Sequence, residues 1–224
     1  MKNIALIPAR GGSKGIKRKN IKLFNKKPLI YWSIKQALES NSIDRVIVST
    51  DDEEIADIAR TCSAEVPFIR PSLLAQDDTP GIEPVLHAIK NLSNVENILL
   101  LQPTSPLRRT FDIDEIFKIR SKYQSDSSVS VTLAKKNIDL FFAIDDNKRL
   151  NSFSEKLKFL PRQKYPKTYI LNGSLYLSSI DSIFQNNSFI SSNTVGYIMP
   201  EEFSIDIDTQ LDWEIAEFLM TQKL

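Results

Sequence analysis

The sequence "NIALIPARGGSKGIKRKN", residues 3–20, joins an apolar run to a basic, glycine-rich loop. The apolar run, Asn3–Pro8, predicts a buried strand. The loop after it contains no acidic residue and holds three glycines, which let backbone amides approach an anion closely. Its five basic side chains are Arg10, Lys14, Lys17, Arg18 and Lys19. Because the loop follows the strand directly, we expect an anion site there. The alternative is a loop that is merely solvated.

Beyond this stretch, apolar runs alternate with helical patterns. Strands are expected at 44–50, 65–70, 96–102, 127–134, 169–179 and 194–200. Helices are expected at 28–40, 51–62, 81–92, 110–123 and at the end of 201–220. This order predicts an α/β fold, a Rossmann-like three-layer sandwich around a mostly parallel sheet. Ligands in such folds bind at the carboxyl ends of the strands, where the basic loop also lies.

Residues 135–168 interrupt the alternation with short apolar pairs and polar turns. We interpret them as a small protrusion within a single domain, residues 1–224. Just beyond it, the dipeptide Asn172-Gly173 between apolar alternations predicts a turn.

Composition limits the classes of function. A net charge of +1 argues against a nucleic-acid binder with a broad basic surface. The single cysteine, Cys62, fits a reducing cytoplasm, and no apolar run approaches the ~20 residues of a membrane helix. The single histidine, His87, follows Glu83 in a helical pattern, so catalysis through histidine is not supported. We therefore expect a cytoplasmic protein without nucleic-acid or membrane partners.

The motif "SIDID", residues 204–208, carries two carboxylates. Strand alternation would put Asp206 and Asp208 on one face, about 7 Å apart at ~3.4 Å per residue. Such a pair can bind one hard cation, since Mg²⁺ takes one or two carboxylates together with substrate phosphates. The alternative is that Asp208 caps the last helix.

Two proline-bearing loops at strand ends, residues 70–81 and 100–108, offer polar side chains that suit a nucleotide's base and sugar. These are Arg70, Thr79, Gln102, Thr104, Ser105 and Arg108. Shaping of turns is the alternative role. Arg162, in a third segment, could bind a carboxylate through two hydrogen bonds.

Five segments together resemble the cytidylyltransferases that make CMP-sialic acids, and they span nearly the whole chain. They are "IPARGGSKGIKRKNI", "RPSLLAQDDT", "LLQPTSPLR", "RQKYPKTYILNGSLYL" and "IDIDT". The resemblance implies that the anomeric hydroxyl of a 2-keto sugar acid attacks the α-phosphate of CTP. CMP-sugar and pyrophosphate result, and Mg²⁺ (or Mn²⁺) is required.

The resemblance also assigns roles to residues. Nucleotide-binding residues would be Arg10, Ser13, Lys14, Asn20, Arg70, Thr79 and Gly81. Sugar-binding residues would be Gln102, Arg162, Asn172, Tyr176 and Phe189, with Arg162 on the sugar carboxylate. Catalytic residues would be Lys19, Arg162, Asp206 and Asp208, the two aspartates also binding the metal.

The family is homodimeric through a protrusion like residues 135–168, which reaches into the partner's sugar site. Either Lys135 or Lys136 matches the family's lysine there, and Phe189-Ile190 stands where the family has two adjacent aromatic residues. These departures lie at the sugar end and leave the sugar open among N-acetylneuraminate, legionaminate and pseudaminate. Alternative functions are a 3-deoxy-octulosonate cytidylyltransferase, a metal-dependent nucleotide-sugar glycosyltransferase and a nucleic-acid-binding module.

Overall fold

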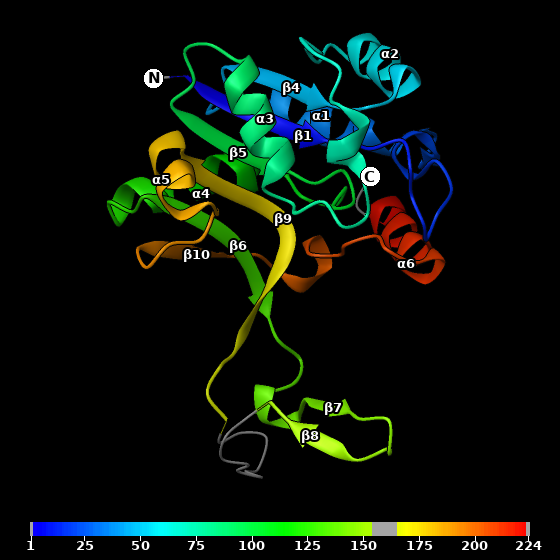
Figure 1. Cartoon of the computed structure of the whole chain (residues 1–224), viewed down its shortest axis with the longest axis vertical. Coiled ribbons are helices and arrows are strands. Elements are labelled where there is room, and N and C mark those ends of the chain that lie inside the picture. Colours follow the sequence, from blue (N-terminus) through cyan, green and yellow to red (C-terminus); the bar gives the residue numbers. More distant parts are fainter. Residues whose placement is uncertain (1, 154–164, 223–224) are drawn as a thin grey trace.

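The computed structural model describes residues 2–153 and 165–222, and its centre is a six-stranded sheet (Figure 1). The strand order is β10-β6-β9-β5-β1-β4. The pairs β1–β4, β1–β5 and β6–β10 are parallel, whereas β9 runs antiparallel to β5 and β6. The strands are β1 (Asn3–Pro8), β4 (Arg45–Ser49), β5 (Asn97–Leu101), β6 (Ser127–Leu133), β9 (Tyr169–Ser179) and β10 (Thr194–Ile198). The mostly parallel α/β sheet predicted from the sequence is confirmed.

Helices cover both faces of the sheet because successive strand residues point to opposite sides. One apolar cluster joins Ala5 and Ile7 of β1 to α1, α2 and α4, while another joins Ile4 and Leu6 to α3 and α5. The helices are α1 (Leu29–Leu38), α2 (Glu53–Thr61), α3 (Glu83–Asn91), α4 (Thr110–Lys122), α5 (Ile180–Asn186) and α6 (Gln210–Thr221). No helix within the described residues is long and apolar enough to span a membrane.

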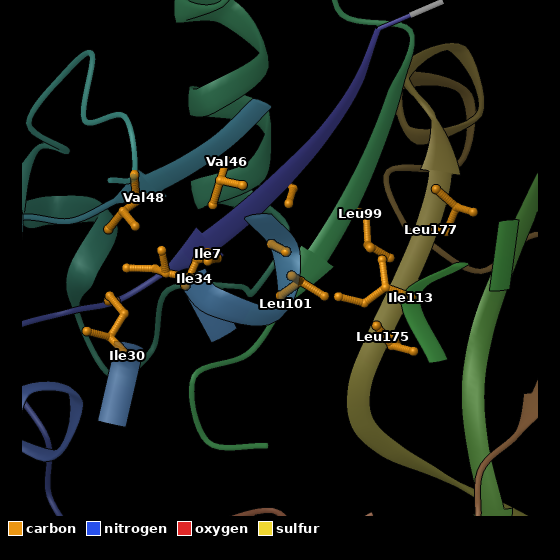
Figure 2. Close-up of a cluster of buried hydrophobic side chains, with 14 of the residues drawn as sticks. Ile7, Ile30, Ile34, Val46, Val48, Leu99, Leu101, Ile113, Leu175 and Leu177 are labelled. Atoms are coloured by element: carbon orange, nitrogen blue, oxygen red, sulfur yellow. The ribbon is translucent and has the colours of Figure 1, made fainter. Parts of the chain in front are cut away.

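The cluster under α1 and α4 is the larger of the two. Figure 2 shows Leu99 and Leu101 of β5 between Ile7 of β1 and Leu175 of β9. Both leucines are 0% exposed, and a Leu→Ala change at such a site costs about 2–5 kcal/mol. This core fixes the carboxyl ends of β1 and β5, from which the functional loops leave.

A two-stranded hairpin lies apart from the main sheet, where β6 and β9 extend beyond it (Figure 1). It pairs β7 (Phe142–Ile144) with β8 (Leu150–Ser152). A second small pair, β2 (Leu23–Phe24) with β3 (Lys27–Pro28), precedes α1.

Two local predictions, a strand at residues 65–70 and a turn at Asn172-Gly173, are wrong. Residues 65–70 form only isolated bridges, Ile47–Glu65 and Thr50–Ile69, because Pro67 has no N–H to donate to a ladder. Asn172-Gly173 lies inside β9, where a positive φ of 73° at Gly173 accompanies a shift in register with β6. Strand β6 pairs with β9 before and after this dipeptide, at Leu171 and at Tyr176, so the chain continues as one strand without reversing.

The segment that carries Asp206 and Asp208 also differs from its predicted structure. Residues 204–208 lie outside the named strands. Thr209, not Asp208, is the N-cap of α6, since its hydroxyl accepts a hydrogen bond from the backbone N–H of Asp212.

Candidate active site

A cleft of about 440 Å³ opens beyond the carboxyl ends of β1 and β5. Residues from four separate parts of the chain line it. They include Arg10, Ser13, Lys14, Lys19 and Asn20 from the basic loop, Arg70, Asp77 and Thr79 from the loop before α3, Gln102 and Thr104 after β5, and Asp208. The predicted anion site therefore lies in a cleft where parallel strands end, as ligand sites do in open α/β sheets.

The basic loop is held at several points. The side-chain amide of Asn20 is buried and donates to the carbonyl of Arg10 over 3.0 Å, which closes the loop on itself. Ile16 is buried under α6, and Gly15 lies so close to the carbonyl oxygen of Asp208 that a Cβ would clash. Glycine is required at that position, and Ser13 and Lys14 line the cleft.

Arg18 anchors the loop instead of facing the cleft. Its guanidinium donates to the carboxylates of Asp52 and Glu54. Asp52 is the N-cap of α2 and accepts from the backbone N–H of Ile55. The hydrogen bond from Arg18 lowers the pKa of the Asp52 carboxyl.

Lys19 connects the basic loop to the aspartate segment. Its ammonium donates to the carbonyl of Ile207 over 2.7 Å and to a carboxylate oxygen of Asp208 over 3.3 Å. The lysine side chain is only 14% exposed. Lys19 and Asp208 thus meet in the cleft, whereas Asp206 is not among the residues that line it.

Asp206 and Asp208 lie on either side of a buried isoleucine. Ile207 is 0% exposed, and its backbone N–H donates to the carbonyl of Thr104, which fixes the extended segment. Asp208 is exposed, whereas Asp206 is half-buried. Burial raises the pKa of Asp206, a hydrogen bond with Thr104 lowers it, and the charge of Asp208 raises it further.

The aspartate pair fits a hard divalent cation. Oδ1 of Asp206 is buried and has no hydrogen-bond partner among the described residues, so it has an unused acceptor position. No group of three or more His, Cys, Asp or Glu side chains positioned to hold a metal occurs within the described part of the chain. Two carboxylates with oxygens from a bound phosphate are nevertheless a set that Mg²⁺ accepts.

The loop before α3 places Arg70 and Thr79 in the cleft but not Gly81. Arg70 is 3% exposed, and its guanidinium lies 3.7 Å from the carboxylate of Asp51, while Nε has no partner among the described residues. Burial lowers the pKa of Arg70. Gly81 is absent from the residues that line the cleft, and a Cβ at this position would meet no atom within 4 Å.

The residues expected to bind the sugar lie in different surroundings. Gln102 lines the cleft. Tyr176 on β9 is half-buried and contacts Phe189, which is buried, with ring centroids 6.0 Å apart; burial and then the charge of Asp206 raise the pKa of Tyr176. The amide of Asn172 is used within the fold, by Ser130 and Ser204. Arg162 lies outside the described residues.

Arg108 supports the cleft from behind and is not exposed to a ligand. Its side chain is 1% exposed and donates to the carbonyl of Ser174 on β9, to Gln36 and to Ser33 on α1. Burial lowers the pKa of Arg108 to about 9. The direct nucleotide contact considered for this residue is therefore wrong.

Asp77 is a cleft residue that the sequence analysis missed. Its carboxylate pairs with both Arg10 and Lys14. An acidic pair, Asp77-Asp78, in the middle of a loop that otherwise suits a nucleotide was the available signal.

A family model described as cytidylyltransferase matches residues 4–221. Three bacterial relatives are each 35% identical to this chain. Post-translational flagellin modification protein B of Campylobacter coli covers 98% of this chain and 95% of its own length. The N-acylneuraminate cytidylyltransferase of Escherichia coli covers 99% of this chain, which spans 53% of that relative. For CMP-N,N'-diacetyllegionaminic acid synthase of Legionella pneumophila, the match covers 98% of this chain and 97% of the relative.

Among solved structures, the chain is similar to CMP:2-keto-3-deoxy-manno-octonic acid synthetase complexed with CTP. The TM-score is 0.77, and the match covers 100% of both chains at 16% sequence identity. At that identity the likeness concerns the fold.

Proposed function

The chain belongs to the cytidylyltransferase family and is a nucleotidyltransferase, and on that premise we propose that it transfers CMP from CTP to a nonulosonic acid. The anomeric hydroxyl of the sugar forms the new bond to the α-phosphorus. The bond from that phosphorus to the bridging oxygen breaks, and pyrophosphate leaves.

One observation carries this proposal: the contact of Lys19 with the Ile207–Asp208 segment. It joins the basic loop to the aspartate segment, and Lys19 and Asp208 both line the cleft. A reaction at the α-phosphate needs both, because negative charge develops on the leaving pyrophosphate while the nucleophile loses a proton.

The side chains take the following roles in the proposed reaction. Arg10, Ser13, Lys14 and Lys19 bind the triphosphate, Asn20 holds the loop, and Arg70 and Thr79 bind the nucleoside. Asp206 and Asp208 would hold Mg²⁺ (or Mn²⁺), which supplies positive charge next to the reacting phosphate. His87 packs on Phe68 in the α3 region, with ring centroids 5.1 Å apart, so we assign proton removal from the sugar hydroxyl to one of the two aspartates.

The sugar is proposed to be a nonulosonic acid of the sialic acid type. Relatives whose names specify an acylneuraminate and a diacetyllegionaminate are equally similar to the chain, at 35% identity. A relative named pseudaminic acid cytidylyltransferase from Campylobacter jejuni is 32% identical. These names support the class of sugar and favour it over the octulosonate, whose enzyme is similar in fold at 16% identity. N-acetylneuraminate is our first choice, and Arg162 would bind the sugar carboxylate.

The decisive experiment offers the purified protein CTP, Mg²⁺ and one sugar at a time. The panel contains N-acetylneuraminate, legionaminate, pseudaminate and 3-deoxy-octulosonate, and pyrophosphate release is followed. We expect release with at least one nonulosonate and little with the octulosonate. Release with the octulosonate alone would replace the proposed substrate class, and release with none would contradict the proposed function.

A further inference from the structure

The carboxylate of Asp77 forms ion pairs with two of the cations assigned to the triphosphate, Arg10 and Lys14. One oxygen of Asp77 lies 2.9 Å from the guanidinium of Arg10, and the other lies 2.8 Å from the ammonium of Lys14. Arg10 also donates to the carbonyl of Ala75, in the same loop as Asp77. Each oxygen of Asp77 thus stands where an oxygen of a bound phosphate would be expected.

The loop that carries Asp77 is braced by its own hydrogen bonds. The hydroxyl of Thr79 donates to the carbonyl of Leu73, and the side-chain amide of Gln76 donates to the carbonyl of Ser72. Arg70, at the start of the loop, is buried. The loop therefore presents Asp77 to the basic loop as a preformed turn.

The residues of the Asp77 bridge line two cavities. A second cavity of about 400 Å³ lies beside the first and shares Arg10, Lys14 and Asp77 with it. These three residues, together with Ser13, Ala75 and Gln76, lie where the two cavities meet. A phosphate that replaced Asp77 on Arg10 and Lys14 would therefore border both cavities.

The bridge is weak enough to break. Its side chains are 35%, 78% and 48% exposed for Arg10, Lys14 and Asp77, and exposed ion pairs contribute little to stability. The hydrogen bonds from Lys14 and Arg10 lower the pKa of Asp77, so the carboxylate stays charged at neutral pH and repels a second anion. A phosphate group and the carboxylate cannot both use the same two cations.

We propose that Asp77 is an internal competitor for the phosphate site, which holds Arg10 and Lys14 in the free enzyme and is displaced by CTP. This inference rests on the proposed function, because it takes the same two cations as ligands of the triphosphate. A ligand with several phosphate charges displaces the carboxylate more readily than one with a single phosphate. Asp77 thereby sets the selectivity of the site for polyphosphates and weakens its hold on the departing pyrophosphate.

The test compares Asp77→Asn with Asp78→Asn. Both variants remove one negative charge from the same loop, but Asp78 is exposed and does not line the cleft. Binding of inorganic pyrophosphate and of inorganic phosphate is measured by calorimetry without metal at low salt, and circular dichroism confirms folding. We expect Asp77→Asn to bind pyrophosphate roughly 3- to 10-fold more tightly than the wild type. Asp78→Asn should stay within about twofold, and the difference should shrink at high salt.

The outcomes separate this inference from the proposed function. Equal affinities of the two variants, or weaker binding by Asp77→Asn, would overturn the role of Asp77 even if the wild type binds CTP. Weaker binding only in the presence of Mg²⁺ would also overturn it and would make Asp77 a ligand of the cation. A wild-type protein that binds neither CTP nor pyrophosphate would contradict the proposed function, and with it the inference.

Discussion

Lys19 is the residue on which the proposed chemistry depends most at the level of single side chains. Its ammonium contacts the carbonyl of Ile207 and the carboxylate of Asp208. Lys19→Ala removes a charge that would stabilise the leaving pyrophosphate, so kcat/KM for CTP should fall by about 10²-fold. Lys17→Ala is the matched control, because Lys17 is exposed in the same loop and does not line the cleft. The measurement is steady-state kinetics with varied CTP. Equal kcat/KM values for the two variants would contradict a role of Lys19 in phosphate binding.

The aspartate pair gives a second prediction at this scale. Asp206→Asn and Asp208→Asn should each remove most activity and leave the protein folded, because the amide keeps the shape but lacks the charge. Asp206→Asn should melt at the same or a higher temperature, since it relieves a half-buried carboxylate next to a like charge. Activity as a function of Mg²⁺, with melting temperature, is the measurement. If either variant keeps near-full activity at low Mg²⁺, the paired-ligand role is wrong for that residue.

Among the elements, strand β9 shapes the site through its bend at Gly173. The φ of 73° is unfavourable for other residues, and a Cβ there would lie 3.1 Å from a carboxylate oxygen of Asp206. Gly173→Ala should lower the free energy of unfolding by about 1–2 kcal/mol and reduce kcat by displacing Asp206. Gly196→Ala on β10 is the control, since its Cβ would make an ordinary contact 3.5 Å from Val131. Urea denaturation of both variants, with similar losses, would refute a special role for the bend.

Helix α2 links the basic loop to the pH dependence of stability. Arg18 lowers the pKa of Asp52, so the pair stabilises the folded state above the unfolded-state pKa of about 4. This contribution is lost as the pH falls through the lower pKa of the folded state. Asp52→Asn should therefore cost about 0.5–1 kcal/mol at pH 7 and progressively less in acid. Denaturation curves at pH 7 and in acid, below the unfolded-state pKa of Asp52, test this. Asp57→Asn is the control, because the ion pair of Asp57 with Arg60 is exposed. If the difference in unfolding free energy between the wild type and Asp52→Asn does not depend on pH, the effect is due to helix capping alone.

The elements that the sequence predicted well are those with a long periodic pattern. The helices α1 to α4 and the buried strands β1, β4 and β5 follow directly from their apolar spacing. Residues 65–70 and Asn172-Gly173 were misassigned because their outcome depends on neighbours. A proline removed a ladder hydrogen bond in the first case, and pairing with β6 before and after the dipeptide kept the strand continuous in the second.

At the level of the whole molecule, the sequence predicted some residues of the candidate site and not others. Position after a strand identified Arg10, Lys14 and Gln102 as cleft residues, because carboxyl ends of parallel strands meet. Spacing could not show that Arg108 is buried, that Asn172 bonds within the fold, or that Asp77 crosses the cleft to Arg10. Those facts depend on contacts between segments far apart in the sequence.

The exposed apolar side chains of the hairpin predict an assembly. Phe141, Ile144, Leu150 and Phe153 are 44%, 65%, 63% and 66% exposed, and such a patch indicates an interaction surface. We expect a two-fold dimer that covers this patch, measured by light scattering at micromolar concentration. Leu150→Glu should yield a monomer, whereas Leu211→Glu on α6, where the leucine is 65% exposed, should not. A monomeric wild type, or dissociation only by Leu211→Glu, would contradict this surface.

The proposed reaction transfers the CMP part of CTP and releases the two outer phosphates together. The most direct measurement follows the fate of phosphorus in CTP labelled at either the α- or the γ-position, with the accepted nonulosonate and Mg²⁺. We predict that the α-label enters the sugar product and the γ-label appears as pyrophosphate, one for each sugar consumed. Release of the γ-label as inorganic phosphate, or an α-label that never reaches the sugar, would contradict the account.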